Sequence, residues 1–150
     1  MKRIEALALA IARENNALEP GSEAFQTLNP GLLRSHSVDR VDPINSNGIR
    51  TFLTFQAGWQ ALLNNIHAKC AGRTQARGYE GRLTIDSTLA DLIRTFRYVS
   101  ARHIIDALQD ALQDRAINER TKLGFFLEGL NGNAGNGHSS TADTLSAAAQ

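Results

Sequence analysis

The chain has 150 residues, of which 42% are hydrophobic, and 16 basic side chains against 15 acidic ones give it a net charge of +1. This length suits one domain whose core needs no disulfide or metal, and the nearly balanced charge provides no overall field that would favour nucleic acid as a partner. The single cysteine, Cys70, excludes an internal disulfide and a zinc cluster of cysteines, so we expect it to be a packed thiol.

The first predicted element is an amphipathic helix from Ile4 to about Glu14. At about 100° per residue, Ile4, Leu7, Ala8 and Ile11 form one apolar stripe. Glu14 comes one helical turn after Ile11 and falls on the same stripe. The pattern therefore predicts a helix that ends in an inward-facing glutamate.

The same segment shares some features with a secretion signal, because Lys2 and Arg3 precede an apolar run that contains the small residues Ala8 and Ala10. Glu5 interrupts this short run, and its spacing fits an amphipathic helix better than a signal. No stretch approaches the length of a bilayer-spanning helix, so we expect no stable membrane insertion.

Residues 35–54 are polar and irregular, and they contain the pair Asn47-Gly48, at which we predict a turn. An Asn-Gly pair tolerates positive φ at both turn positions and therefore favours a tight hairpin. Its arms would be residues 38–44 and 49–53, and Pro43 limits the first arm to an edge or a short pairing.

Helical patterns dominate the rest of the chain. The predicted N-caps are Thr54, Thr88 (in a capping box with Asp91) and Asn118. The positions expected to face inward are Phe55, Trp59, Leu62, Leu63 and Ile66, then Leu89, Leu92, Ile93 and Phe96, then Ile104, Ile105, Leu108, Ala111 and Leu112, and last Leu123, Phe126, Leu127 and Leu130. Residues 72–83 are rich in Gly and Arg and predict a mobile basic loop.

The predicted fold class is therefore α+β and mainly α, with one small β-hairpin. The domain would span residues 1–128. Residues 129–150 are rich in Gly, Asn, Ser and Ala and cannot bury enough apolar surface to offset their ordering entropy, so we expect a flexible tail.

Glu14 is the first candidate for chemistry. A carboxyl on the buried side of a helix C-terminus loses water and meets the negative end of the helix dipole, and both effects favour the protonated acid. A protonated acid near neutral pH is what cleavage of a glycosidic bond requires. The alternative interpretation is an ordinary solvated glutamate, or one paired with its neighbour Arg13.

Other candidate constellations are weaker. His36, His67, His103 and His138 are scattered, with no spacing that predicts a metal site or a nucleophilic triad, and we expect no cofactor. The arginines of the basic loop, Arg73, Arg77 and Arg82, could contact phosphate or simply form a solvated loop. Trp59 could stack on a sugar, but its helical spacing favours the core.

Three segments together resemble a known family. They are Ala10-Ile11-Ala12-Arg13-Glu14 with Pro20-Gly21-Ser22 and Asn29-Pro30-Gly31-Leu32-Leu33-Arg34, then residues 48–62 with their Gly58-Trp59-Gln60-Ala61-Leu62 helix start, and last Thr88-Leu89-Ala90-Asp91-Leu92-Ile93. In this order and spacing they are similar to the small lysozyme-like proteins related to phage structural lytic transglycosylases and goose-type lysozymes. The resemblance covers roughly residues 4 to 96.

The resemblance implies a lysozyme-like fold and cleavage of the β-1,4 bond between N-acetylmuramic acid and N-acetylglucosamine in peptidoglycan, with Glu14 as the catalytic residue. It places Asn29 and Gly31 on the cleft floor and Arg34 beside it, with Tyr98 as a further substrate-binding candidate. Neither Asp39 nor Asp42 is identified as a second catalytic carboxylate.

The implied partner is the glycan strand of peptidoglycan, and we expect a monomer. The site of action would be the cell envelope or periplasm, reached by phage lysis or by a secretion machine. A second hypothesis stays open, since Thr27, Leu28 and Leu32 stand where the family shows asparagines: a catalytically degenerate lysozyme-like module that binds glycan or serves in assembly.

Overall fold

The computed structural model describes residues 1–34, 44–45, 47–78, 81–97 and 99–127. Helices predominate in this part of the chain, and two short strands form an antiparallel sheet, as the predicted mainly helical α+β class requires. The helices are α1 (Arg3–Glu14), α2 (Glu23–Gln26), α3 (Phe55–Cys70), α4 (Leu89–Ile93), α5 (Ala101–Leu112) and α6 (Gly124–Leu127), and the strands are β1 (Arg77–Gly78) and β2 (Gly81–Arg82).

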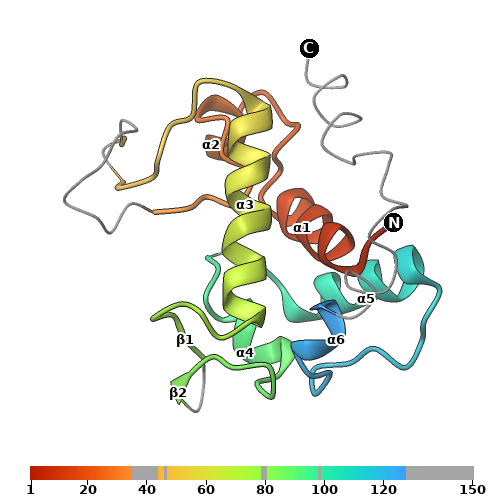
Figure 1. Cartoon of the computed structure of the whole chain (residues 1–150). Helices are drawn as coiled ribbons and strands as arrows, with labels where there is room; N and C mark the ends of the chain where they lie inside the picture. The colour runs from red at the N-terminus through yellow and green to blue at the C-terminus, as the bar shows by residue number, and fades with distance from the viewer. Residues whose placement is uncertain (35–43, 46, 79–80, 98, 128–150) are drawn as a thin grey trace, which may run out of the picture.

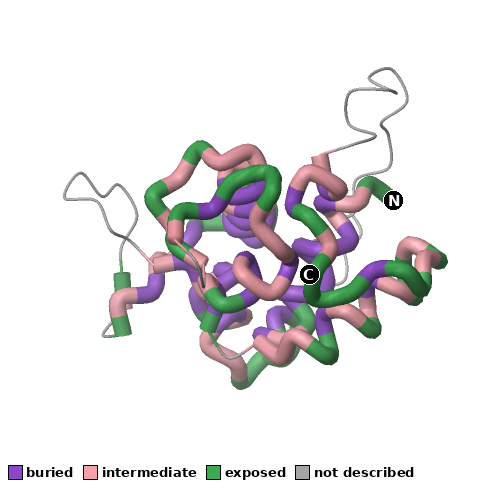
Figure 2. The backbone as a smooth tube through the Cα atoms, turned by 90° about the horizontal axis from the view of Figure 1, so that it is seen from below, coloured by how far each residue is buried: buried purple, intermediate pink, exposed green. Residues whose placement is uncertain are grey.

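Helix α1 lies at the centre of the molecule and packs against α3, α5 and α6 (Figure 1). Every residue from Ala6 to Ala12 is buried, and Figure 2 shows the buried backbone gathered in the middle of the molecule. The alternating alanines have small side chains, so neighbouring helices can approach α1 on several sides. The prediction of a one-sided apolar stripe is therefore wrong, because α1 is buried on nearly every side before it reaches Arg13.

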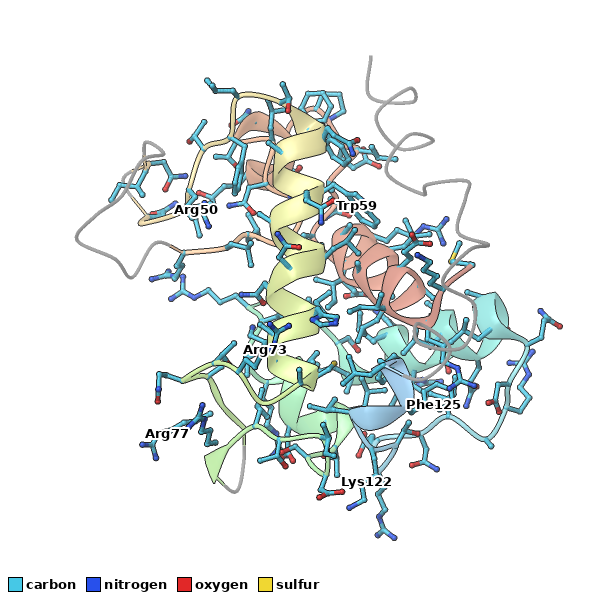
Figure 3. All side chains as sticks on the ribbon, in the orientation of Figure 1. Arg50, Trp59, Arg73, Arg77, Lys122 and Phe125 are labelled. Atoms are coloured by element: carbon cyan, nitrogen blue, oxygen red, sulfur yellow. The ribbon has the colours of Figure 1, made fainter. Side chains whose placement is uncertain are left out.

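Helix α3 begins at the predicted cap, where the Thr54 hydroxyl accepts a hydrogen bond from the Ala57 N–H at 3.0 Å. Trp59 is completely buried (Figure 3), which confirms its place in the core and leaves no ring face for a sugar. Leu62 and Ile66 are also fully buried, and each such side chain stabilises the fold by about 2 kcal/mol. The inward residues of α3 are Phe55, Trp59, Leu62, Ile66 and Cys70 as predicted, while Leu63 is only partly buried.

The start of α4 confirms the predicted capping box. The Thr88 hydroxyl accepts from the Asp91 N–H at 3.2 Å, and the Asp91 carboxylate accepts from the Thr88 N–H at 3.1 Å. In α5, Ile104 and Leu108 are buried as predicted, whereas Ala111 is exposed in the last turn.

The two-stranded sheet lies in the segment that we predicted to be a mobile loop. Arg77 pairs with Arg82 and Gly78 with Gly81. A Cβ on Gly78 would come within 2.5 Å of the Asp91 Cβ, so the missing side chain allows this hairpin to pack against α4. Leu83, directly after β2, is fully buried. These long-range contacts order a segment whose own sequence shows no strand periodicity.

Around Asn47 and Gly48 the predicted turn is present, and the described residues beside it form no continuous strand. Gly48 has a φ of +78°, and its N–H donates to the Asn45 carbonyl at 3.0 Å. The described residues beside the turn form isolated bridges, Ile44 with Arg50 and Arg34 with Ile49. Most of the predicted first arm, with Asp39 and Asp42, lies outside the described residues.

The prediction that Asn118 caps the last helix is also wrong. Its side chain accepts from the Arg120 N–H at 2.7 Å in a local turn, and α6 begins only at Gly124. Asparagine readily bonds its own backbone two residues on, which competes with capping. Leu123 and Phe126 are buried as predicted. Leu130, the predicted boundary at residue 128 and the tail lie outside the described residues.

Gly58 fixes how the loop at residues 28–30 lies against α3. A Cβ on Gly58 would collide with the carbonyl oxygen of Leu28 and lie 3.1 Å from the Cδ of Pro30. The missing side chain at this position therefore admits the loop. Leu28 itself has a φ of +53°, a conformation that a leucine rarely adopts. This contact fixes the position of the loop, which follows Glu14 in the chain.

Candidate functional site

Glu14 is the last residue of α1, and its carboxylate faces the beginning of α5. Its side chain is 20% exposed, with Oε1 2.7 Å from His103 Nδ1. Oε2 accepts a long hydrogen bond, 3.4 Å, from the Ser100 N–H. The free N–H groups of a helix N-terminus attract negative charge, and this contact places the carboxylate beside those of α5. The alternative partner, Arg13, is exposed.

His103 is a partner of Glu14 that the sequence analysis missed, because 89 positions separate the two residues. At this distance a carboxyl and an imidazole can share one proton, which either group can donate to the other. The His103 side chain is 67% exposed and can therefore exchange protons with solvent. Ser100 caps α5 through the His103 N–H at 3.4 Å, which sets the start of the helix beside α1.

Asn15 and Asn29 connect the end of α1 to the loop that follows it. The Asn15 Nδ2 donates to the Pro30 carbonyl at 2.9 Å. The Asn29 side chain accepts from the Leu33 N–H at 2.9 Å and donates to the carbonyls of Leu33 at 3.0 Å and Arg50 at 2.9 Å. Asn29 is completely buried. Its amide therefore holds the loop in shape and offers no exposed surface to a ligand.

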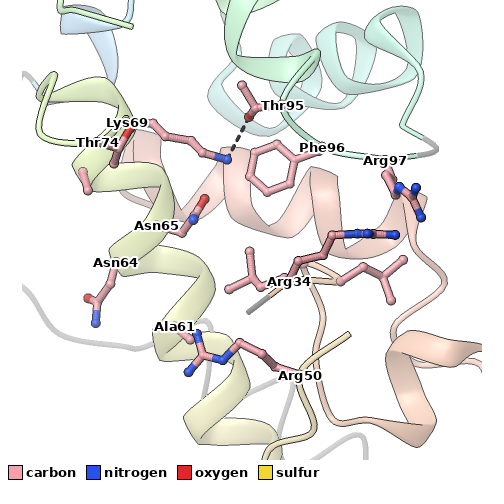
Figure 4. A pocket seen from close by; sticks show the side chains of 14 residues that line it. Arg34, Arg50, Ala61, Asn64, Asn65, Lys69, Thr74, Thr95, Phe96 and Arg97 are labelled. Atoms are coloured by element: carbon pink, nitrogen blue, oxygen red, sulfur yellow. Dashed lines mark hydrogen bonds between the residues drawn. The ribbon is translucent and has the colours of Figure 1, made fainter. Parts of the chain in front are cut away.

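A pocket of about 690 Å³ opens beside α3, within the size range of small-molecule sites (Figure 4). Among the described residues that line it, four side chains are cationic and none is a carboxylate, so the pocket is suited to an anionic ligand. Arg34 lies between Lys69 at one end and Arg50 at the other in Figure 4. The lining residues are Gly31, Leu32, Leu33, Arg34, Arg50, Ala61, Asn64, Asn65, Ala68, Lys69, Thr74, Thr95, Phe96 and Arg97.

Of the predicted site residues, Gly31 and Arg34 line this pocket, and Asn29 lies beneath it. Glu14 is not among the lining residues. Its neighbours reach the pocket within three positions, however, since Asn15 contacts the residue before Gly31 and Ser100 follows Arg97. Glu14 is therefore connected to the pocket only through these neighbouring residues. Tyr98 is outside the described residues.

Lys69 is the second functional candidate that the sequence analysis missed. Its side chain is 6% exposed, and Nζ donates to the Thr95 hydroxyl at 2.8 Å and lies 3.9 Å from the centre of the Phe96 ring. Burial lowers the pKa of Lys69 to about 8. Burial also raises the pKa of the neighbouring Cys70 thiol to about 12. The burial of Lys69 could have been predicted from the sequence, since Lys69 continues the inward stripe of Leu62 and Ile66.

Within the described residues, no group of three or more His, Cys, Asp or Glu side chains could hold a metal ion. Over the same residues, none of the helices combines the length and hydropathy needed to cross a membrane. Comparison of the chain with protein-family models, with curated proteins and with solved structures finds no match.

Proposed function

We propose that this protein is a lysozyme-like enzyme that cleaves the glycan strands of peptidoglycan with Glu14 as its acid and base. The observation that carries the proposal is the setting of Glu14: a half-buried carboxylate at the end of a buried helix, whose hydrogen-bonded neighbours lead to a polar pocket of about 690 Å³. The resemblance of the segments around Glu14, Gly31 and Gly58 to lysozyme-like proteins supports the same reaction.

The chemistry needs one carboxyl that changes role. As an acid, Glu14 gives its proton to the glycosidic oxygen, and the bond between that oxygen and the anomeric carbon breaks. As a carboxylate, it then takes a proton from the C6 hydroxyl of the muramic residue, whose oxygen bonds to the anomeric carbon and gives a 1,6-anhydro product. Attack by water in place of that hydroxyl gives ordinary hydrolysis. Either route restores the proton that Glu14 gave away.

His103 fits this cycle as a proton exchanger. Its Nδ1 is within hydrogen-bond distance of Glu14, while most of the ring is in contact with solvent. It can therefore return a proton to Glu14 or remove one between turnovers without entering the pocket. A second carboxylate of the two-group glycosidase arrangement is not needed if the substrate supplies its own nucleophile.

The test compares wild type, Glu14→Gln and the control Glu19→Gln on purified cell walls, followed by zymography and loss of turbidity. Glu19 is an exposed glutamate a short distance along the chain. We expect clearing by wild type and by Glu19→Gln, and a loss of at least about 10³-fold in Glu14→Gln. Mass spectrometry of the products separates the two routes, because anhydro ends are one water lighter than reducing ends.

One observation favours a second candidate, a glycan-binding module without activity. Glu14 is not among the residues that line the cationic pocket, so binding there does not require the carboxyl. If neither wild type nor Glu14→Gln clears cell walls and both sediment with them, the enzymatic proposal is wrong and the binding module is supported.

A further inference from the structure

Three features of the pocket converge on its Lys69 end. The Lys69 ammonium is held between the Thr95 hydroxyl and the face of the Phe96 ring, as Figure 4 shows. The Thr95 hydroxyl in turn donates to the Leu92 carbonyl at 2.7 Å, so it accepts from Lys69 with a fixed orientation. The amine therefore has a defined position in the wall of an open pocket.

The surroundings of Lys69 do not neutralise its charge. It contacts a hydroxyl and an aromatic ring, and the lining of the pocket contains no Asp or Glu among the described residues. A buried ammonium without a counter-charge is costly, and its cost falls when an anion arrives. The lowered pKa of Lys69 is consistent with this incomplete neutralisation.

Two further polar atoms of the same lining are buried and have no hydrogen-bond partner among the described residues. They are the side-chain oxygen Oδ1 of Asn65 and the Nε of Arg34. One is an acceptor and the other a donor. Buried polar groups in proteins are nearly always paired, so an orphaned acceptor and donor in one pocket indicate a ligand that supplies the missing partners.

We infer that the Lys69 end of the pocket is a binding site for a carboxylate, carried by a sugar ligand whose hydroxyl or amide N–H reaches Asn65. The choice of ligand rests on the proposed function, since the muramic residues of peptidoglycan carry such groups. Two sources share this chemistry: the lactyl carboxylate of a muramic residue that has lost its peptide, and a carboxylate of the peptide itself.

Calorimetric titration of three probes tests the inference. The first is N,N′-diacetylchitobiose, which is uncharged. The second is an N-acetylglucosaminyl–muramic disaccharide with a free lactyl carboxylate, and the third is the same disaccharide with the lactyl group in amide linkage to a peptide. We expect wild type to bind the second or the third probe at least about 10-fold more tightly than the first, because only these probes offer Lys69 a charged hydrogen-bond partner.

Lys69→Met supplies the matched comparison, with Lys2→Met as an exposed control. We expect Lys69→Met to lose the preference for the charged probe while it binds chitobiose as wild type does. The charged probe that wild type prefers identifies the source of the carboxylate. Equal affinity of wild type for all three probes, no binding of any probe, or an undiminished preference in Lys69→Met would overturn the inference.

A second measurement avoids any dependence on the variant. The chain contains three lysines, Lys2, Lys69 and Lys122, so the spectrum of protein labelled with ¹³C-lysine shows three Cε signals. The charged probe should shift the Lys69 signal alone, and an unmoved Lys69 signal at saturation contradicts the inference. Both experiments measure binding and not cleavage. An inactive protein can therefore still bind the charged probe at Lys69, and an active protein can lack this binding.

Discussion

We call Glu14 and Lys69 the two ends of the site. Their charged groups lie in opposite surroundings. At one end, Glu14 is partly open to water and faces an imidazole that is itself mostly exposed. At the other, Lys69 is 6% exposed and faces a hydroxyl and an aromatic ring. A group in contact with water gains and loses protons readily, whereas a dry charge exchanges slowly and binds an opposite charge strongly. The difference separates proton transfer from ligand binding within one site.

The loop at residues 28–34 connects these two ends. Asn15, next to Glu14, contacts the loop at Pro30, while Gly31 and Arg34 of the same loop line the pocket. The relative position of the two ends therefore depends on how firmly α3 and the Asn29 amide hold the loop. Changes to the loop should affect both ends together, and changes at one end should leave the other intact.

The largest expected effect is that of Gly58→Ala. The new Cβ would collide with the Leu28 carbonyl oxygen, and since this is backbone the loop must move. We expect the free energy of unfolding, measured in urea, to fall by about 3–4 kcal/mol, well beyond the gain of about 1 kcal/mol in helix propensity. The control is Gly124→Ala, whose Cβ would meet ordinary contacts of 3.5 Å and more. A Gly58→Ala protein as stable as the control would show that the loop is not held by α3.

The next effect is that of Asn29→Ala. The substitution removes three hydrogen bonds and leaves the Leu33 N–H and the Leu33 and Arg50 carbonyls without that partner. We expect a loss of about 3 kcal/mol in the free energy of unfolding, and in the folded protein a loss of both cell-wall cleavage and probe binding. The control is Gln60→Ala, an exposed amide bonded to Asn64 and outside the pocket lining, which should stay within about 0.5 kcal/mol of wild type. Loss of only one function would mean that the loop does not couple the two ends.

The sequence predicts the parts of this site that depend on local chemistry. The cap at Thr54, the capping box of Thr88 and Asp91, and the buried stripe of α3 follow from spacing alone, and the structure confirms them. Spacing also predicts that Glu14 ends a helix and points inward.

What the sequence cannot predict is which distant segments meet. Neither the partner of Glu14 nor the role of the Asn29 amide follows from local periodicity, since both depend on residues brought together by packing. The sheet at residues 77–82 was missed for the same reason, because contacts with α4 and the burial of Leu83 order it. Lys69 lies on a predictable stripe, but an isolated lysine on such a stripe does not reveal that a pocket lies beside it.

A smaller effect, of opposite sign, is expected from Lys69→Met. Burial lowers the pKa of Lys69 to about 8 from the ordinary 10.5, so the unfolded chain binds more protons between these two values. The contribution of this lysine to stability therefore rises with pH across that window, and its cost is fully present below about pH 8. Since the bonds to Thr95 and Phe96 are lost as well, we expect Lys69→Met to be about 1–2 kcal/mol more stable than wild type at pH 7.

This advantage should shrink as the pH rises from about 8 to about 10.5. The raised pKa of Cys70 lowers the stability of both proteins above about pH 9, since the folded state then holds the thiol proton more strongly. To a first approximation, this effect of Cys70 cancels when the free energies of unfolding of wild type and Lys69→Met are compared at each pH by urea unfolding. Lys2→Met, an exposed control, should show no such pH-dependent difference. A Lys69→Met protein less stable than wild type at pH 7 would mean that the dry ammonium is already well compensated.

The smallest effect is expected at the other end, from His103→Gln. Glutamine can still hydrogen-bond the Glu14 carboxylate but cannot carry a proton, so the substitution separates positioning from proton exchange. We expect the turnover rate on cell walls to fall about 10-fold with little change in KM, and the shape of the pH–rate profile to change, because water must then exchange the Glu14 proton alone. The control is His67→Gln, a histidine of α3 that contacts Arg73 instead. An unchanged rate at every pH would reduce His103 to a surface partner of Glu14, while weaker binding of the charged probe would mean that the two ends are not separate after all.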